Sequence, residues 1–183
     1  MYDADLGYKL NHAMFQRNGR AGYVLKPLAL RVVDKILLQR KTNHILDVTV
    51  ISAQQLPRPR DSDGLEVDDK QIVDPYIEVS VHMPDWTHSP FAPGGGGEGT
   101  LRARTAAART NVVKNNGFNP VWQETLSLAY DVVGDMRDLV FVRFEVYDEA
   151  DDEEPLAEYT IGLGSLQHGK SNHLAKKGRD CVC

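Results

Sequence analysis

Residues 72–81 read Ile-Val-Asp-Pro-Tyr-Ile-Glu-Val-Ser-Val, and this stretch decides the fold. From Ile77 to Val81 apolar and polar residues alternate, which is the period of a β-strand with one buried face. Asp74 stands immediately before this strand, at the end of a charged and turn-prone stretch that begins near residue 58. The sequence therefore predicts a half-buried strand with an acidic loop at its start.

The same alternation returns in three other segments, which are residues 46–51, 122–128 and 140–146. Strands of this length, separated by turn-rich loops, are typical of an antiparallel sandwich. Residues 83–103 contain three prolines and four consecutive glycines, so we predict a long loop there. Trp86 and Phe91 lie in that loop, either as partly buried residues of a hairpin tip or as contacts with a bilayer interface.

Length and charge limit the function classes. A chain of 183 residues holds one well-cored domain with an appendage, whereas a complete (β/α)₈ barrel needs about 200 residues or more. No apolar run approaches the ~18 residues of a spanning helix, and residues 1–20 lack a secretory signal, so we expect a cytosolic or membrane-peripheral protein. Residues 61–183 hold eleven Lys and Arg against twenty-two Asp and Glu, which argues against nucleic acid as a partner.

The first 31 residues predict a helix followed by a short extended piece. Leu6, Leu10 and Met14 recur four residues apart, and Ala13 and Phe15 broaden the apolar stripe. The extended piece covers residues 23–25, which are β-favouring, and Pro27 ends it. A unit this small cannot bury its own core, so it must pack on something else. A basic connector, residues 32–43, follows it.

Two acidic groups flank two of the predicted strands. The first group comprises Asp61, Asp63, Glu66, Asp68, Asp69 and Asp74, and the second comprises Asp148, Glu149, Asp151, Asp152, Glu153 and Glu154. If the two strands are neighbours, both groups meet at one rim, where two carboxylates ~4 Å apart repel by about 4 kcal/mol. Calcium would relieve this repulsion because it prefers six to eight oxygen ligands. The alternative is a solvated acidic rim that only orients the domain at a membrane.

Two short strings resemble a known family. Gly22-Tyr23-Val24-Leu25-Lys26-Pro27 resembles the end of the catalytic barrel of phosphoinositide-specific phospholipase C, and Ile72-Val73-Asp74-Pro75-Tyr76 resembles a calcium-loop segment of the C2 domain that follows that barrel. Asn11–Phe15, Val50–Pro57 and Asn116–Trp122 also match the family, so the resemblance covers nearly the whole chain. Trp122 matches the buried anchor of the C2 core.

The resemblance implies a mainly β protein, in which an antiparallel C2-type β-sandwich follows a short α/β remnant of a TIM barrel. It assigns residues 1–31 to the barrel remnant (the end of the catalytic Y region), 32–43 to a linker and 44–183 to a C2 domain that lacks its last strand. We interpret the missing strand as the mark of a truncated or mispredicted product; the alternative is that the terminal Cys181 and Cys183, which resemble a geranylgeranylation signal, belong to a genuine ending.

Family members hydrolyse phosphatidylinositol 4,5-bisphosphate to diacylglycerol and inositol trisphosphate, with two barrel histidines and a catalytic calcium. The resemblance places all of these groups upstream of this segment, so we expect no phospholipase activity from this chain alone. It implies that the C2 unit braces the barrel and orients it on anionic membrane phospholipids, from the cytoplasm. The alternative is a non-enzymatic C2 adaptor that binds calcium and phospholipid.

The resemblance also implies a set of calcium ligands. Asp74 matches the aspartate of the first loop, Asn115 an oxygen ligand of the second loop, and Asp148 an aspartate of the third loop. Members that bind calcium well often carry Asp-x-Asp in the third loop, whereas here Ala150 stands at the second position. We therefore predict that Asp151, or alternatively Asp152, completes the set with a shifted backbone, or that the site is weakened.

Overall fold

The computed structural model describes residues 6–31, 41–57, 73–85, 102–134, 136–150 and 154–166. Its helices are α1 (Leu6–Phe15), η1 (Asn18–Arg20), α2 (Leu28–Arg31), η3 (Met136–Leu139) and η4 (Leu163–Ser165). Its strands are β1 (Lys41–Ser52), β2 (Pro75–Asp85), β3 (Arg102–Arg109), β4 (Val121–Val133), β5 (Phe141–Asp148) and β6 (Ala157–Gly162). Among these residues, no helix is both long and apolar enough to cross a bilayer.

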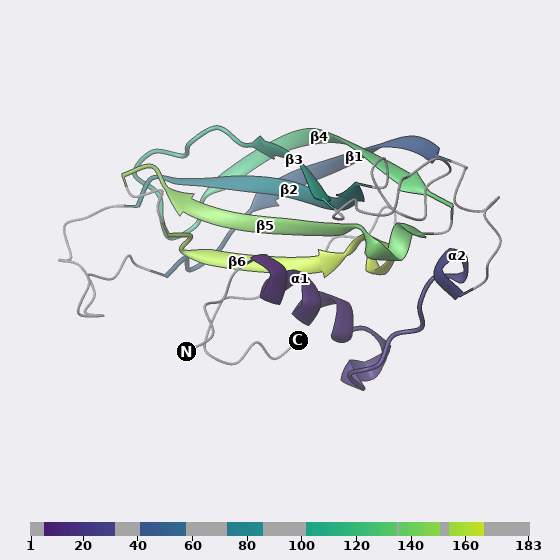
Figure 1. The fold of residues 1–183 in the computed structure, drawn as a ribbon. Coiled ribbons are helices and arrows are strands. Elements are labelled where there is room, and N and C mark those ends of the chain that lie inside the picture. The colour runs from purple at the N-terminus through teal and green to yellow at the C-terminus, as the bar shows by residue number, and fades with distance from the viewer. Residues whose placement is uncertain are drawn as a thin grey trace.

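The strands form two antiparallel sheets that pack face to face (Figure 1). β1 pairs with β4 in one sheet, and the other has the order β3-β2-β5-β6. In the second sheet, Pro75 at the start of β2 is paired with Asp148 at the end of β5. This register places the beginning of one central strand beside the end of the other.

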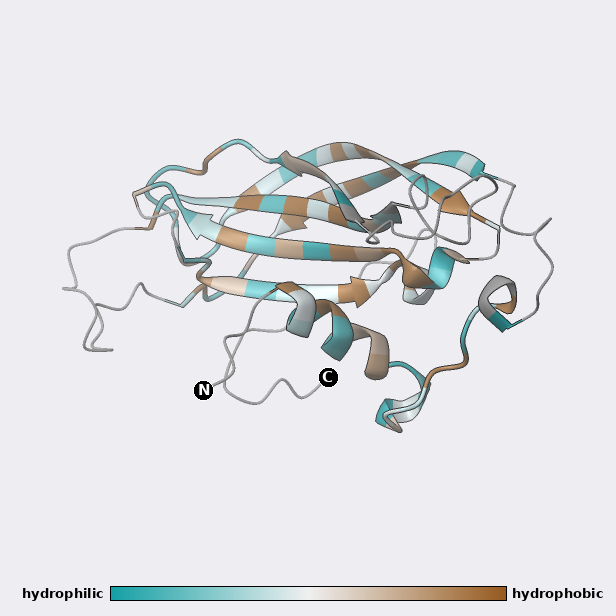
Figure 2. Ribbon diagram, in the orientation of Figure 1, coloured by the Kyte–Doolittle hydropathy of each residue, from teal (hydrophilic) through white to brown (hydrophobic). Residues whose placement is uncertain are grey.

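The core lies between the sheets, because the alternating sequence places the apolar residues of each strand on one face. Val79 and Val81 of β2 and Val142 of β5 have no exposed surface, and they pack in one cluster with residues of β4 such as Leu128, which is 2% exposed. Figure 2 shows the resulting alternation of hydrophobic and hydrophilic residues along the strands. Trp122 is also buried in this cluster, as the resemblance to the C2 core implied.

The predicted sandwich is confirmed, and its strands differ from the prediction in extent and number. Three of the four predicted segments lie within strands, and the fourth, residues 140–146, begins one residue before β5; β3 and β6 were not predicted. The predicted loop 83–103 is wrong at both ends, because β2 continues to Asp85 and β3 begins at Arg102. The remainder of that loop, with Trp86 and Phe91, lies outside the described residues.

The helix predicted near the start is confirmed as α1, which packs on β6. Ala13 is its buried residue, whereas Phe15 is 38% exposed, so the prediction that Phe15 joins the apolar stripe is wrong. Two ion pairs hold the segment, from Lys9 Nζ to Glu158 Oε2 at 2.6 Å and from Arg17 Nη1 to Asp138 Oδ1 at 3.0 Å. Its origin as a barrel remnant stays a prediction.

The junction between this segment and the sandwich differs from the expected one. Residues 23–25 form no strand, and the described chain continues through them to α2. β1 begins at Lys41, so the last residues of the predicted linker belong to the sheet, while residues 32–40 lie outside the described part.

Candidate functional site

Two predicted ligands, Asp74 and Asp148, meet at one end of the four-stranded sheet. The backbone N–H of Asp74 donates to Asp148 Oδ1 at 3.1 Å, and the N–H of Glu149 donates to the Asp74 carbonyl oxygen at 3.1 Å. The antiparallel register of β2 and β5 produces this meeting, because it pairs the neighbouring Pro75 with Asp148. We call the set Asp74, Lys114, Asn115, Asp148 and Glu149 the rim.

Asn115 joins the rim from the loop between β3 and β4. Its backbone N–H donates to Asp74 Oδ1 at 2.6 Å, and its φ of 56° lies in the left-handed region that asparagine tolerates. The next turn is closed by Asn116, whose side chain bonds both the N–H and the carbonyl of Asn119, at 3.1 and 3.0 Å. The loop is therefore fixed locally beside Asp74.

Gly117 sets how closely this loop approaches the start of β2. A Cβ atom at Gly117 would lie 2.7 Å from the Cβ of Val73, closer than side-chain carbons come in proteins. Val73 itself is 6% exposed. Only glycine therefore lets the loop pack against the residue that precedes Asp74.

Asp148 is the buried member of the rim, with no exposed surface. Its Oδ1 accepts from the N–H groups of Asp74 and Ala150, at 3.1 and 3.4 Å. Its Oδ2 is buried without a hydrogen-bond partner. A buried carboxylate oxygen without a partner is costly, and a cation is one group that satisfies it.

Lys114 brings a positive charge to the rim, and the sequence reasoning missed it. Its Nζ lies 3.5 Å from Asp74 Oδ2 and forms an ion pair with the Glu149 carboxylate. The hydrogen bond that Lys114 donates to Glu149, opposed by burial and helped by the charges of Glu149 and Asp74, raises the pKa of Lys114. No sequence signal marked this lysine, because its role depends on the position of a loop.

The rim thus unites three of the four predicted ligands, Asp74, Asn115 and Asp148, while Asp151 lies outside the described residues. Carboxylate and amide oxygens are the donors that calcium prefers, so the chemistry of these residues fits that metal. In the structure, backbone N–H groups already donate to Asp74 Oδ1 and Asp148 Oδ1. Within the described part of the chain, no three His, Cys, Asp or Glu side chains are grouped as metal ligands. A bound ion would draw on the carboxylates of Asp74 and Asp148.

Comparison with known proteins places this arrangement in a family. The family model described as "C2 domain" matches residues 44–177. The chain belongs to the C2 domain family. The match begins just inside β1 and extends past η4, so it includes both sheets and the rim.

Curated relatives of this C2 protein include several phosphodiesterases. It is 34% identical to 1-phosphatidylinositol 4,5-bisphosphate phosphodiesterase eta-2 of Mus musculus, over 86% of this chain and 9% of the relative. It is also 34% identical to the delta-1 enzyme of Homo sapiens, over 91% of this chain and 20% of the relative. These matches confirm the resemblance to phosphoinositide phospholipase C. The chain spans a fifth or less of the length of these relatives.

A solved structure agrees on the fold. The crystal structure of PLC21 from L. pealei aligns with 88% of this chain and 18% of its own length, with a TM-score of 0.53 and 20% sequence identity.

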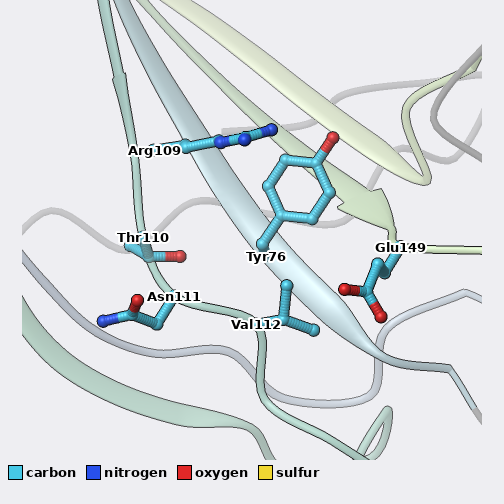
Figure 3. Close-up of a pocket in the computed structure, with 6 residues that line it drawn as sticks. All are labelled: Tyr76, Arg109, Thr110, Asn111, Val112 and Glu149. Atoms are coloured by element: carbon cyan, nitrogen blue, oxygen red, sulfur yellow. The ribbon is translucent and has the colours of Figure 1, made fainter.

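Beside the rim, the C2 domain has a pocket of about 250 Å³, lined by Tyr76, Arg109, Thr110, Asn111, Val112 and Glu149 (Figure 3). The Arg109 guanidinium carbon lies 5.8 Å from the centre of the Tyr76 ring, and Tyr76 stacks on Tyr147 at 5.5 Å. Because Glu149 belongs to both, the pocket adjoins the rim. Its lining combines one cation, one anion and an aromatic ring.

The outer face of the four-stranded sheet of the C2 domain carries a network of buried and partly buried charges. Arg143 Nη2 lies 2.6 Å from Glu145 Oε1 and 2.9 Å from Glu158 Oε2. The Tyr147 hydroxyl donates to Glu145 at 2.8 Å, and burial is the main cause that raises the pKa of Tyr147. These contacts join β5 and β6 beneath the segment where α1 sits, so they brace the sheet.

Proposed function

We propose that this chain is the C-terminal, C2-containing portion of a phosphoinositide phospholipase C, and that its rim binds calcium. In this proposal calcium lets the rim approach anionic phospholipids from the cytoplasm. The C2 domain then orients a catalytic barrel on the membrane surface, where the barrel hydrolyses phosphatidylinositol 4,5-bisphosphate. In this proposal the catalytic groups lie outside this chain, so the absence of phospholipase activity from the chain alone stays a prediction.

The observation that carries the calcium proposal is the convergence of Asp74, Asn115 and Asp148 at one end of the sheet. The unpartnered Oδ2 of the buried Asp148 supports it, because it leaves an anionic oxygen for a cation. C2 domains commonly bind calcium and phospholipid membranes, which agrees with such a site.

The packing of α1 supports the connection to a barrel. The relatives match this chain over up to 93% of its length, which includes residues before the C2 domain. That earlier segment is tied to the C2 domain by the ion pairs of Lys9 and Arg17. A free adaptor has no need of such a segment, so the phospholipase C proposal accounts for more of the chain.

Calcium calorimetry with vesicle co-sedimentation tests the proposal. We expect heat on calcium addition, and calcium-dependent binding to vesicles of phosphatidylcholine with phosphatidylserine but not to phosphatidylcholine alone. Asp74→Asn removes a rim charge and keeps the acceptor for the Asn115 N–H, so we expect calcium affinity to fall by about tenfold or more.

Asp47→Asn is the matched control. Asp47 is an exposed residue of β1 that accepts a hydrogen bond from Ser127 Oγ at 2.6 Å, away from the rim. The Asp47→Asn substitution removes the same charge as Asp74→Asn and should leave the calcium affinity unchanged. The proposal is overturned if wild-type protein shows no calcium heat and its lipid binding is indifferent to a chelator.

A further inference from the structure

We propose that Lys114 is a tethered cation of the rim, which holds Asp74 and Glu149 when calcium is absent and must leave them when calcium binds. This inference rests on the proposed calcium site and adds its regulation. Lys114 then lowers the calcium affinity of the site and sets the calcium level at which the rim changes charge.

The contacts of Lys114 place its charge where a metal would act. Its Nζ lies 3.5 Å from Asp74 Oδ2 and pairs with the Glu149 carboxylate, so it bridges the first and third loops. Asp74 is also a predicted calcium ligand, and one carboxylate oxygen cannot serve the ammonium and a metal ion fully at once. Calcium binding at Asp74 therefore competes with Lys114.

The side chain is able to leave. The Lys114 side chain is 55% exposed, and that of Glu149 is 49% exposed, so neither is held by packing. An exposed ion pair is weak because water screens it and its side chains lose freedom when they form it. A dication that gains several oxygen ligands can displace such a contact.

Asp148 gives a second, independent indication that the rim receives a cation. Lys114 forms no contact with Asp148 among its described interactions, and the buried Asp148 Oδ2 keeps no partner. The tethered ammonium therefore neutralises only the exposed part of the rim. In this inference a bound calcium ion also neutralises the buried part of the rim, because it reaches Asp148 Oδ2, the carboxylate oxygen that the lysine leaves without a partner.

Replacing the lysine tests the inference. In Lys114→Met the rim loses its internal cation, so calorimetry should show calcium binding about three- to tenfold tighter than in wild-type protein. Lys114→Arg keeps a positive charge and should stay near the wild-type affinity. Thermal unfolding provides a second readout, since calcium should raise the melting temperature more in Lys114→Met than in wild-type protein.

Lys41→Met is the matched control, because Lys41 is also an exposed lysine in an ion pair, with Asp131 at 2.8 Å on the β1–β4 sheet. It removes the same charge away from the rim and should not tighten calcium binding. A calcium affinity in Lys114→Met equal to that of Lys41→Met overturns the role of Lys114 and leaves the calcium site standing. Absence of binding in wild-type protein and in both variants overturns the calcium site and this inference together.

Discussion

His82 lies in the middle of β2, with both ring nitrogens engaged. One is 2.9 Å from Ser80 Oγ and the other is 3.1 Å from Thr105 Oγ1 on β3. The residue is 5% exposed, and burial, followed by the nearby charge of Arg143, lowers the pKa of His82. The histidine is therefore neutral, and its contact with Thr105 connects β2 to β3. Its other partner, Ser80, is also buried.

This environment predicts a loss of stability in mild acid. Because the folded state lowers the pKa of His82, the unfolded chain binds more protons as the pH falls through about 6.5, and the free energy of unfolding decreases. We expect the melting temperature to drop by a few degrees between pH 7.5 and 5.5, and this drop to shrink in His82→Gln. Thermal unfolding across that pH range measures it.

The control is His44→Gln, which changes an exposed histidine of β1 and should keep the wild-type pH dependence. Asp131 does not contribute to the change in melting temperature between pH 7.5 and 5.5. Hydrogen bonds from Lys41, opposed by burial and helped by Arg104, lower the pKa of Asp131, so its effect on stability lies below about pH 4. An unchanged pH dependence in His82→Gln would contradict the prediction.

Single residues of the rim were predictable to different degrees. The meeting of Asp74 and Asp148 could be predicted, because each residue lies at the end of a strand that the sequence shows clearly. The prediction needed only the assumption that these two strands are neighbours. Lys114 was not predictable, because its ion pairs need the loop between β3 and β4 to lie beside the start of β2. The closure of that loop depends on Gly117 and Val73, whose close approach has no signature in a single sequence.

Among the strands, composition decided which ones the sequence revealed. β2 and β5 alternate branched or aromatic residues with polar ones, so their period is plain. β3 reads Arg-Ala-Arg-Thr-Ala-Ala-Ala-Arg. Because alanine is depleted in strands, this sequence does not indicate a strand by itself, and the pairing with β2 stabilises it as one. β6 is short and mostly only partly buried, so its alternation is too weak to mark it as a strand.

The packing of α1 on β6 leads to a prediction about that helix. Ala13 is 4% exposed, and Ala13→Glu would bury a carboxylate, so we expect α1 to detach from the sheet. Hydrogen exchange of the amides in residues 6–15 should then speed up by about tenfold or more. The amides of the core strands should keep their protection, because the core lies between the sheets.

Asn11→Glu provides the control for Ala13→Glu, since Asn11 is exposed on the same helix. It adds the same charge and should leave exchange near the wild-type rate. Equal protection of α1 in both variants would show that the helix is not held by the buried face of Ala13. The ion pairs of Lys9 and Arg17 would then be its main attachment.

Charge is distributed unevenly over the whole protein. Residues 1–60 hold ten Lys and Arg against four Asp and Glu, whereas the later residues are strongly acidic, and the chain carries a net charge of -5. At an anionic membrane, an acidic rim is repelled until a cation neutralises it. The proposed calcium ion therefore changes the sign of the interaction at one end of an otherwise acidic domain.

This electrostatic origin predicts how membrane binding responds to salt. The screening length falls from about 10 Å at 0.1 M salt to about 4 Å at 0.5 M, so calcium-dependent binding to phosphatidylserine vesicles should weaken by roughly tenfold or more. Co-sedimentation at fixed free calcium measures this, with Asp74→Asn as a baseline that should be weak at both salt concentrations. Binding by inserted apolar side chains would hardly change with salt, because burial of apolar surface is not screened. Salt-independent binding would therefore contradict a calcium-bridged contact and would direct attention to apolar residues instead of the rim.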